Sequence, residues 1–380
     1  LALASNQTGR DAPVVTRLKQ AGAIIIAKAN LSEWANMRSE RSSSGWSAVG
    51  GQTRNPHDLN RSACGSSSGS AVVVAAHLAV AAIGTETNGS ITCPSSATGI
   101  VGFKPTVGAV SRTGIVPISE TQDTAGPMTK SVLDAALIQS VIQGEDPADP
   151  VTTVERKSLD LSKLAAATPS WLNNKRLGVL VSDAENHEGV KQVFESALTQ
   201  LGQTGVTLVR DLKFVPYPKF FDDGYQVLLY EFKTTLNQYL ATLPGQFGQL
   251  TLARLIDFNR RHKSKEMPYF QQEVFEKAQS KGPLTDPDYT QALSRLRQAT
   301  RQEGIDKMLQ AHKLDALITV TLSPVWTIDQ INGDAYVAGF SSYPAIAGYP
   351  HLTLPMGKVH HLPVGLSITG SKDQAQEMFA

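Results

Sequence analysis

The chain has little cysteine, almost no net charge and no long apolar run. Its 380 residues include only 2 cysteines, Cys64 and Cys93. Two cysteines are too few for a disulfide framework, and they lack the paired Cys and His spacing of a structural zinc site. We therefore expect both to be small, semi-buried apolar side chains, and we expect neither a metal nor another cofactor.

The charged residues nearly cancel. There are 35 Lys and Arg against 34 Asp and Glu, which leaves a formal net charge of +1. Such a surface gives no reason to expect a nucleic acid or an anionic membrane as a partner. No apolar run approaches the ~20 residues that span a bilayer, and the first residues lack the regions of a signal peptide. We expect a soluble protein that takes a small or neutral molecule, in the cytoplasm rather than the periplasm or outside the cell.

What the chain does have is an alternation of strand and helix patterns. Residues 11–22 predict a helix that Asp11 caps and Gly22 ends, and residues 23–27 predict a buried strand. A long, polar and turn-rich connection follows over residues 31–63. Further apolar strand patterns lie at 81–87, 99–108, 175–181, 206–214, 314–321, 351–357 and 363–370.

This alternation predicts an α/β protein with one large domain, in which helices cover a mixed β-sheet. We expect residues 1–145 to form a core that carries the functional segments, and residues 313–380 to return to that core as its last strands. Residues 146–312 are expected to be a variable, mostly helical cap region within the same domain. Both ends of the chain are expected to be truncated.

The segment CGSSSGS, residues 64–70, is the most unusual local composition. A flexible linker is a poor fit, because the segment runs directly into an apolar helix pattern. A phosphate-binding loop is a poor fit as well, because neither standard glycine-rich pattern is present. Residues 65–69 match G-x-S-x-G with Ser67 as nucleophile, but a polar, charged stretch precedes them where that motif needs a central strand.

A fourth interpretation combines this segment with a second one, GTETNGSITCPSS. Ser90 lies there in a Gly-containing turn at the end of a predicted strand. Such a turn can point successive N–H groups inward and so form an oxyanion hole beside a nucleophile. A helix between the two segments would bring Ser66 back to Ser90.

Residues 50–128 resemble the amidase signature family in a dense and ordered way. The similarity rests on GGQTRNP, CGSSSGS, GTETNGSITCPSS, VGFKPT and DTAGPM, and it continues in AKANLSEW upstream and in SSYPAIAGYPHLTLPMG near the end. Within that family, the segments NLSEWANMRSERSSSGWSAVGGQTRNP and GTETNGSI are most similar to those of the peptide amidases. The resemblance implies the amidase signature fold.

The resemblance also implies a Ser, cis-Ser, Lys triad. Ser90 would be the nucleophile, and Ser66, preceded by a cis peptide bond at Gly65, would relay its proton to a buried neutral lysine. The backbone N–H groups of Thr87, Asn88, Gly89 and Ser90 are implied as the oxyanion hole. Ser67 and Ser68 are expected to support the site by packing and hydrogen bonding.

The lysine of this triad is missing from the chain. Lys19 lies on the predicted helix, and Lys28 and Lys104 match other family positions. We therefore expect that the 380-residue chain is a fragment of an amidase and is crippled when assayed alone. Glu86 is expected to brace the turn of Ser90. Thr92 stands where many members of the family carry Arg, a departure that the peptide amidases share.

The resulting hypothesis is a serine amidohydrolase that cleaves C-terminal amides of peptides, or related small carboxylic amides, through an acyl-enzyme. It is expected to be a monomer or a weak homodimer. The alternative is an amidotransferase A-type component, similar to that of the glutamine-dependent tRNA amidotransferases, which passes ammonia to a partner. A non-catalytic binding remnant is a third possibility.

Ordinary packing or surface roles are expected for four histidines: His57, His77, His360 and His361. Five aromatic residues could line a cleft, but we expect them mainly in the core: Trp46, Tyr225, Tyr230, Tyr239 and Trp326.

Overall fold

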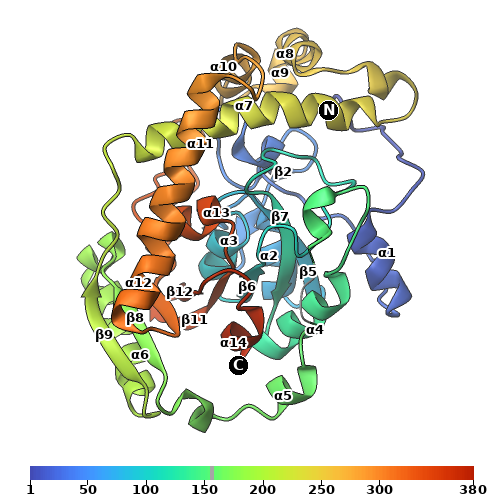
Figure 1. The fold of residues 1–380 in the computed structure, drawn as a ribbon. Helices are drawn as coiled ribbons and strands as arrows, with labels where there is room; N and C mark the ends of the chain where they lie inside the picture. Colours follow the sequence, from blue (N-terminus) through green and yellow to red (C-terminus); the bar gives the residue numbers. More distant parts are fainter. Residues whose placement is uncertain (155–157) are drawn as a thin grey trace.

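The computed structural model describes residues 1–154 and 158–380. Its centre is one eight-stranded sheet with the strand order β5-β7-β6-β11-β12-β10-β8-β9 (Figure 1). The strands are β5 (Ala81–Glu86), β6 (Val101–Lys104), β7 (Thr124–Thr129), β8 (Arg176–Leu180), β9 (Thr207–Leu212), β10 (Ala316–Val320), β11 (His351–Val359) and β12 (Leu362–Thr369). The predicted α/β class is confirmed.

The sheet is mixed, as the sequence predicted. Pairing is antiparallel from β5 through β7, β6, β11 and β12 to β10. Pairing is parallel between β10 and β8 and between β8 and β9. Every residue of β6 and of β10 is buried, because helices cover both faces of the sheet at these strands.

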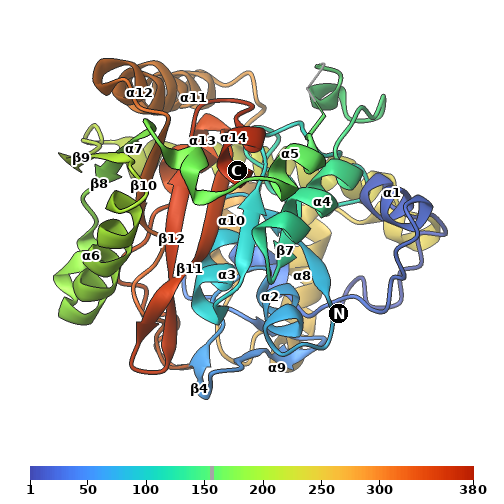
Figure 2. The same cartoon turned by 90° about the horizontal axis from the view of Figure 1, so that it is seen from below.

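Helices pack against the sheet and form layers around it (Figure 2). Phe194 of α6 packs with Val179 of β8 and Ile318 of β10 in one apolar cluster. Ala135 of α4 packs with Phe103 of β6 in another. These helices are α1 (Pro13–Gln20), α2 (Ser68–Ala75), α3 (Thr92–Thr98), α4 (Val132–Ile142), α6 (Glu188–Gly202), α13 (Ser342–Ala347) and α14 (Ala375–Phe379).

A block of helices between β9 and β10 forms a further layer, drawn yellow to orange across the top and down the left of Figure 1. Phe232, Leu236 and Phe275 of this block lie in an apolar cluster that also contains Met37 and Ile118. The helices are α7 (Phe220–Ala241), α8 (Leu252–Arg261), α9 (Lys263–Glu266), α10 (Glu273–Gln279), α11 (Pro287–Thr300) and α12 (Asp306–His312). The boundaries of the cap region at 146 and 312 stay a prediction, and residues 155–157 within it lie outside the described residues.

Two expectations at the N-terminal end are wrong. Residue Ala12, not Asp11, precedes α1, and no side chain caps this helix. Residues 23–27 form no strand, and the side chains of Ile24 and Ile26 are 87% and 67% exposed. β-Branched residues favour extended backbone, but a strand also needs a hydrogen-bonded neighbour, and no described strand pairs with this segment.

The predicted long connection over residues 31–63 holds only two small hairpins. They are β1 (Trp46–Ser47) with β2 (Gly51–Gln52), and β3 (Arg54–Asn55) with β4 (Asp58–Ser62). No helix among the described residues is long and apolar enough to cross a membrane.

Close backbone packing in the sheet makes one glycine critical. A Cβ on Gly126 of β7 would lie 2.0 Å from the carbonyl oxygen of Phe103, whereas a Cβ on Gly202 of α6 would meet nothing within 4 Å. We expect Gly126→Ala to lower the free energy of unfolding by about 2 kcal/mol or more, because backbone must shift. Gly202→Ala should be neutral or raise it by up to about 1 kcal/mol. Urea denaturation of both variants measures this, and equal effects would contradict the packing described.

Candidate active site

Two loops bring the predicted serines together. Ser66 lies just before α2, and Ser90 lies in the turn between β5 and α3. The backbone N–H of Ser67 donates a 3.1 Å hydrogen bond to the carbonyl oxygen of Ser90. The two segments are therefore adjacent at the end of β5, as the fourth interpretation of the sequence expected.

The peptide bond between Gly65 and Ser66 is cis, as expected. Ser66 is only 1% exposed, and its carbonyl oxygen accepts hydrogen bonds from the N–H groups of Ser32 and Ser68. A Cβ at Gly65 would lie 2.3 Å from the Ser32 hydroxyl oxygen, so only glycine fits there. The backbone of Ser66 is thus fixed, yet its Oγ has no hydrogen-bond partner among the described residues.

The other serines of the cluster hold the site to its surroundings. Ser67 Oγ accepts from the Thr85 N–H at 3.0 Å and donates to the Thr85 carbonyl at 2.9 Å. Ser70 Oγ donates to the carbonyl of Ile83 at 2.9 Å. Ser68 Oγ donates to the carbonyl of Cys64 at 2.5 Å. These bonds provide partners for backbone groups of the edge strand β5 and fix the start of α2. Because the three hydroxyls are engaged with the backbone, they have a structural rather than a reacting role.

The turn of Ser90 presents backbone donors. Gly89 has φ +84°, a left-handed conformation that favours glycine, and a Cβ there would lie 3.2 Å from Ser341 Oγ. In the described part of the chain, no acceptor is found for the N–H groups of four consecutive residues, Thr87, Asn88, Gly89 and Ser90. Four free N–H groups in one turn beside a serine are the arrangement that stabilises an oxyanion.

Two buried carboxylates accept hydrogen bonds from this turn. Glu86 is 1% exposed, and its Oε2 accepts from the N–H groups of Ile91 at 2.8 Å and Thr92 at 3.0 Å. Glu86 therefore braces the turn, as expected. Asp123 accepts the hydroxyl of Thr87 at 2.6 Å, and burial raises the pKa of the Asp123 carboxyl.

Sequence reasoning missed two contacts of the turn. Gln122 Nε2 donates to the carbonyl of Thr87 at 3.2 Å, and Asn88 Oδ1 accepts from Ser341 Oγ at 2.6 Å. Both partners are distant from the turn in sequence, Ser341 by more than two hundred residues. Gln122 directly precedes the family segment DTAGPM, and Ser341 begins the family segment SSYPAIAGYPHLTLPMG, but neither segment shows what its residues contact.

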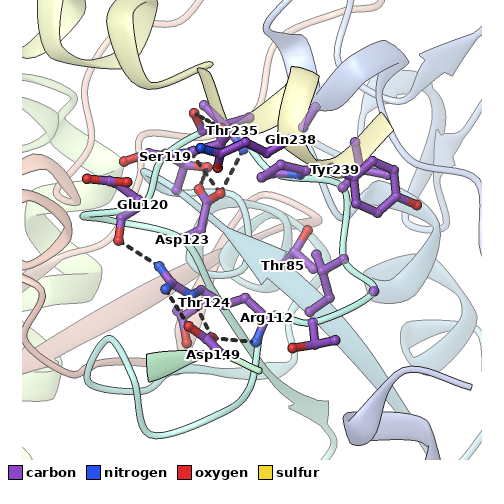
Figure 3. A pocket seen from close by; sticks show the side chains of 18 of the residues that line it. Thr85, Arg112, Ser119, Glu120, Asp123, Thr124, Asp149, Thr235, Gln238 and Tyr239 are labelled. Carbon is purple, nitrogen blue, oxygen red and sulfur yellow. Dashed lines mark hydrogen bonds and ion pairs between the residues drawn. The ribbon is translucent and has the colours of Figure 1, made fainter. Parts of the chain in front are cut away.

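Two hollows border the loops that carry the serine pair. One, of about 360 Å³, is lined by Ser66, Thr85, Thr87 and Asp123 together with side chains of α7, among them Tyr239 (Figure 3). The other, of about 340 Å³, is bordered by Gly65, Asn88 and Gly89, and its remaining wall includes aromatic side chains. Those aromatics are Trp326, Tyr336 and Phe340. We call the first the Ser66 cavity and the second the aromatic cleft.

Of the five aromatic residues considered from the sequence, two line these hollows. Tyr239 borders the Ser66 cavity, and Trp326 borders the aromatic cleft. Trp46 packs edge-on against Phe270, while Tyr225 and Tyr230 donate hydrogen bonds to Glu40 and Asp286, respectively.

The histidines lie away from the serine pair: His57 Nε2 is 2.9 Å from the Thr98 carbonyl, and His77 is exposed. The described residues contain no group of three or more His, Cys, Asp or Glu side chains that could hold a metal ion.

Lys104 is the lysine buried below the turn. It is 0% exposed, and its Nζ donates to the carbonyl of Pro105 at 3.1 Å rather than to a serine. Burial lowers the pKa of this amine to about 8, against the attraction of Glu86. Its strand neighbour His351 is buried as well, and burial lowers the pKa of that imidazole to about 3.

The expectation for the cysteines is wrong in part. Cys64 and Cys93 form a disulfide, with Cα atoms 5.9 Å apart. They are buried or half-buried among apolar side chains, as expected, but the folded chain brings them within bonding distance although 29 positions separate them. A count of two cysteines excludes a framework of several bridges and cannot exclude a single one.

Comparison with known proteins gives a consistent picture. The family model described as Amidase matches residues 1–378. A probable amidase of Arabidopsis thaliana is 35% identical over 377 residues, which are 97% of this chain and 68% of that protein. The crystal structure of the native peptide amidase from Stenotrophomonas maltophilia superposes with a TM-score of 0.91 at 45% identity, over 97% of this chain and 74% of that one. The A-type component of the glutamyl-tRNA(Gln) amidotransferase from Thermotoga maritima superposes with a TM-score of 0.71 at 26% identity, over 98% of this chain and 75% of that one.

Burial of Lys104 predicts a pH-dependent stability. Its pKa is about 8 in the fold against an ordinary 10.5, so between these values the unfolded chain holds the extra proton. Stability from this group therefore rises with pH across that window. From pH 8 to 10.5, the free energy of unfolding of the wild type should therefore rise by about 3 kcal/mol relative to that of Lys104→Met. Urea titrations at several pH values measure it, with the exposed Lys191→Met as control, and a difference that stays flat would contradict the burial of a titrating amine.

Proposed function

Since the chain belongs to the amidase family, we propose that it carries the nucleophile, the relay and the oxyanion hole of a serine amidohydrolase. Ser90 is the proposed nucleophile and Ser66 the proposed relay. The N–H groups of Thr87, Asn88, Gly89 and Ser90 are the proposed oxyanion hole, with Gly65 and Ser67 as support. The observation that carries this proposal is the turn of Ser90, whose four N–H groups are free among the described residues while the buried Ser66 stands beside it.

The proposed reaction has two halves. In the first, Ser90 Oγ attacks the amide carbon and gives its proton to Ser66, and Ser66 gives its own proton to a base. The negative charge on the carbonyl oxygen is held by the four N–H groups. The C–N bond then breaks, ammonia leaves with the returned proton, and the acyl group stays on Ser90 as an ester. In the second half, water takes the place of the serine hydroxyl and releases the acid.

The base that would receive the proton from Ser66 is not found among the described residues. In the family it is a lysine, and no described side chain bonds to Ser66 Oγ. Ser66 borders the Ser66 cavity, which at about 360 Å³ has room for an aliphatic amine. We propose that a lysine from outside this chain belongs in the cavity, and that the chain alone hydrolyses amides slowly because this base is missing.

The proposed substrate is the C-terminal amide of a peptide or a related small carboxylic amide. The 45% identity to a peptide amidase supports this choice over the A-type component of the tRNA amidotransferases, which shares 26% in its structural match. The aromatic cleft offers an apolar wall for a side chain next to the scissile amide. The amidotransferase role and the binding remnant remain the alternatives, and the first would require glutamine and partner subunits.

The compartment and the oligomeric state stay predictions. A monomer or weak homodimer is proposed. The disulfide is typical of an oxidising compartment, and it weighs against the cytoplasm that the sequence favoured.

The nucleophile is tested by substitution in the chain and in a version extended by the lysine-bearing segment of a relative. With a dipeptide amide as substrate, we expect Ser90→Ala to lower the rate of the extended version by a factor of about 10⁴ or more, because the residues of such a triad act as a unit. The chain alone already lacks the base, so the same substitution should cost it less. Ser70→Ala is the matched control, since its hydroxyl bonds only to the Ile83 carbonyl, and it should keep most of the activity. Ammonia release measures both, and a Ser90→Ala protein with unchanged rate would refute the assignment.

The missing base predicts rescue by small amines. Methylamine or ethylamine should raise the slow hydrolysis by the chain at least tenfold, in proportion to the free-base concentration, because the amine can enter the Ser66 cavity and take the proton from Ser66. Ser66→Ala should not respond. The product is identified by mass spectrometry as the free acid, since an amine that merely attacks the acyl-enzyme yields a substituted amide. Fast hydrolysis without any amine would overturn the claim that the chain lacks its base.

A further inference from the structure

The disulfide joins the two loops that carry the serine pair. Cys64 is two residues before Ser66, and Cys93 is three residues after Ser90 at the start of α3. The N–H of Cys93 donates a 2.8 Å hydrogen bond to the carbonyl of Gly89, within the proposed oxyanion turn. Cys64 has φ +56°, a left-handed conformation that is uncommon for a residue with a side chain, and its carbonyl accepts the Ser68 hydroxyl.

Direct links between these two loops are few. The described backbone bonds contain one, from Ser67 N–H to the Ser90 carbonyl. The hydroxyls of Ser67 and Ser70 bind the strand β5, so they connect the first loop to the turn only through that strand. The disulfide is the covalent link between the loops, and it lies on the side of the aromatic cleft.

The disulfide is also part of the cleft wall. Cys64 and Cys93 border the aromatic cleft together with Gly65, Asn88 and Gly89. The same two cysteines belong to an apolar cluster that extends beyond the cleft lining to Ala97, Val325 and Leu362. A small reductant can therefore reach the disulfide through the cleft while the packing behind it stays in place.

We propose that Cys64 and Cys93 are a positioning pair, whose disulfide fixes the loop of Ser66 against the turn of Ser90 and whose reduction slows the reaction. The proposal rests on the proposed function for its effect on rate. A dithiol supplies two electrons and two protons, the S–S bond breaks, Cys64 and Cys93 become thiols, and the dithiol closes to a cyclic disulfide. The two loops then keep one direct hydrogen bond, and displacements of about 1 Å cost up to about 100-fold in rate.

The test uses the whole chain in oxidised and dithiol-reduced form. Alkylation with iodoacetamide and peptide mapping first establish the state of the two cysteines. Hydrogen–deuterium exchange is then measured for peptides covering 62–70 and 86–94. We expect faster exchange in both peptides after reduction and unchanged exchange in β8, which contributes no residue to the apolar cluster of the two cysteines. Unchanged exchange in both peptides, or two free thiols in protein prepared under air, would overturn the proposal.

A second readout measures reactivity. A fluorophosphonate probe at saturating concentration should label the reduced chain between about 10-fold and 100-fold more slowly than the oxidised chain, with the same final extent. Loss of fold would lower the extent instead, and this distinguishes positioning from a merely structural role. Reoxidation with oxidised glutathione should restore the rate, and the double variant Cys64→Ser with Cys93→Ser should label at the reduced rate with or without dithiol.

The two proposals fail in different ways. A Ser90→Ala protein that is labelled as fast as wild type refutes the nucleophile, and the exchange measurement then decides the disulfide by itself. Labelling that requires Ser90 but proceeds at equal rates in the oxidised and reduced chains refutes the positioning pair alone.

Discussion

Three hydrogen bonds of Ser67 hold the site in register. Its N–H reaches the carbonyl of Ser90 at 3.1 Å, and its hydroxyl both accepts from and donates to the backbone of Thr85. One residue thereby fixes the loop before α2, the end of β5 and the turn that follows. The contact needs space as well: a Cβ on Gly84 would lie 3.1 Å from Ser67 Oγ and 2.6 Å from the sulfur of Met128. The G-x-S-x-G match gave Ser67 the role of nucleophile, whereas its bonds describe a residue that holds other groups in place.

Buried polar groups also fix the turn of Ser90 in place. Glu86 Oε2 accepts from the N–H groups of Ile91 and Thr92, and Asp123 Oδ1 accepts the hydroxyl of Thr87. The N–H groups of residues 87–90 have no acceptor among the described residues and are left for a substrate oxygen. A buried carboxylate is costly when an oxygen lacks a hydrogen bond, as Glu86 Oε1 does among the described residues, and the positive charge of Lys104 compensates for part of this cost. The turn is thus organised before any substrate arrives, which is the condition for effective oxyanion stabilisation.

Much of this could be predicted from the sequence, because apolar alternation determines the sheet and the two serine segments are distinctive. The strand expected at residues 23–27 shows the limit, since periodicity indicates extended backbone but cannot supply a neighbouring strand. The disulfide shows another limit, because two cysteines 29 positions apart say nothing of their distance in space. The contacts of Gln122 and Ser341 were missed for the same reason: both residues reach the turn through tertiary contacts, which a single sequence does not record.

The central claim is that Ser90, rather than another serine of this crowded site, receives the acyl group. An activated p-nitrophenyl ester of a short peptide bypasses the slow amide step and can acylate the chain even without the missing base. Peptide mapping by mass spectrometry after acid quenching then locates the ester. The account predicts the acyl mass on the peptide that contains Ser90, whereas an ester on Ser66 or Ser67 would contradict it.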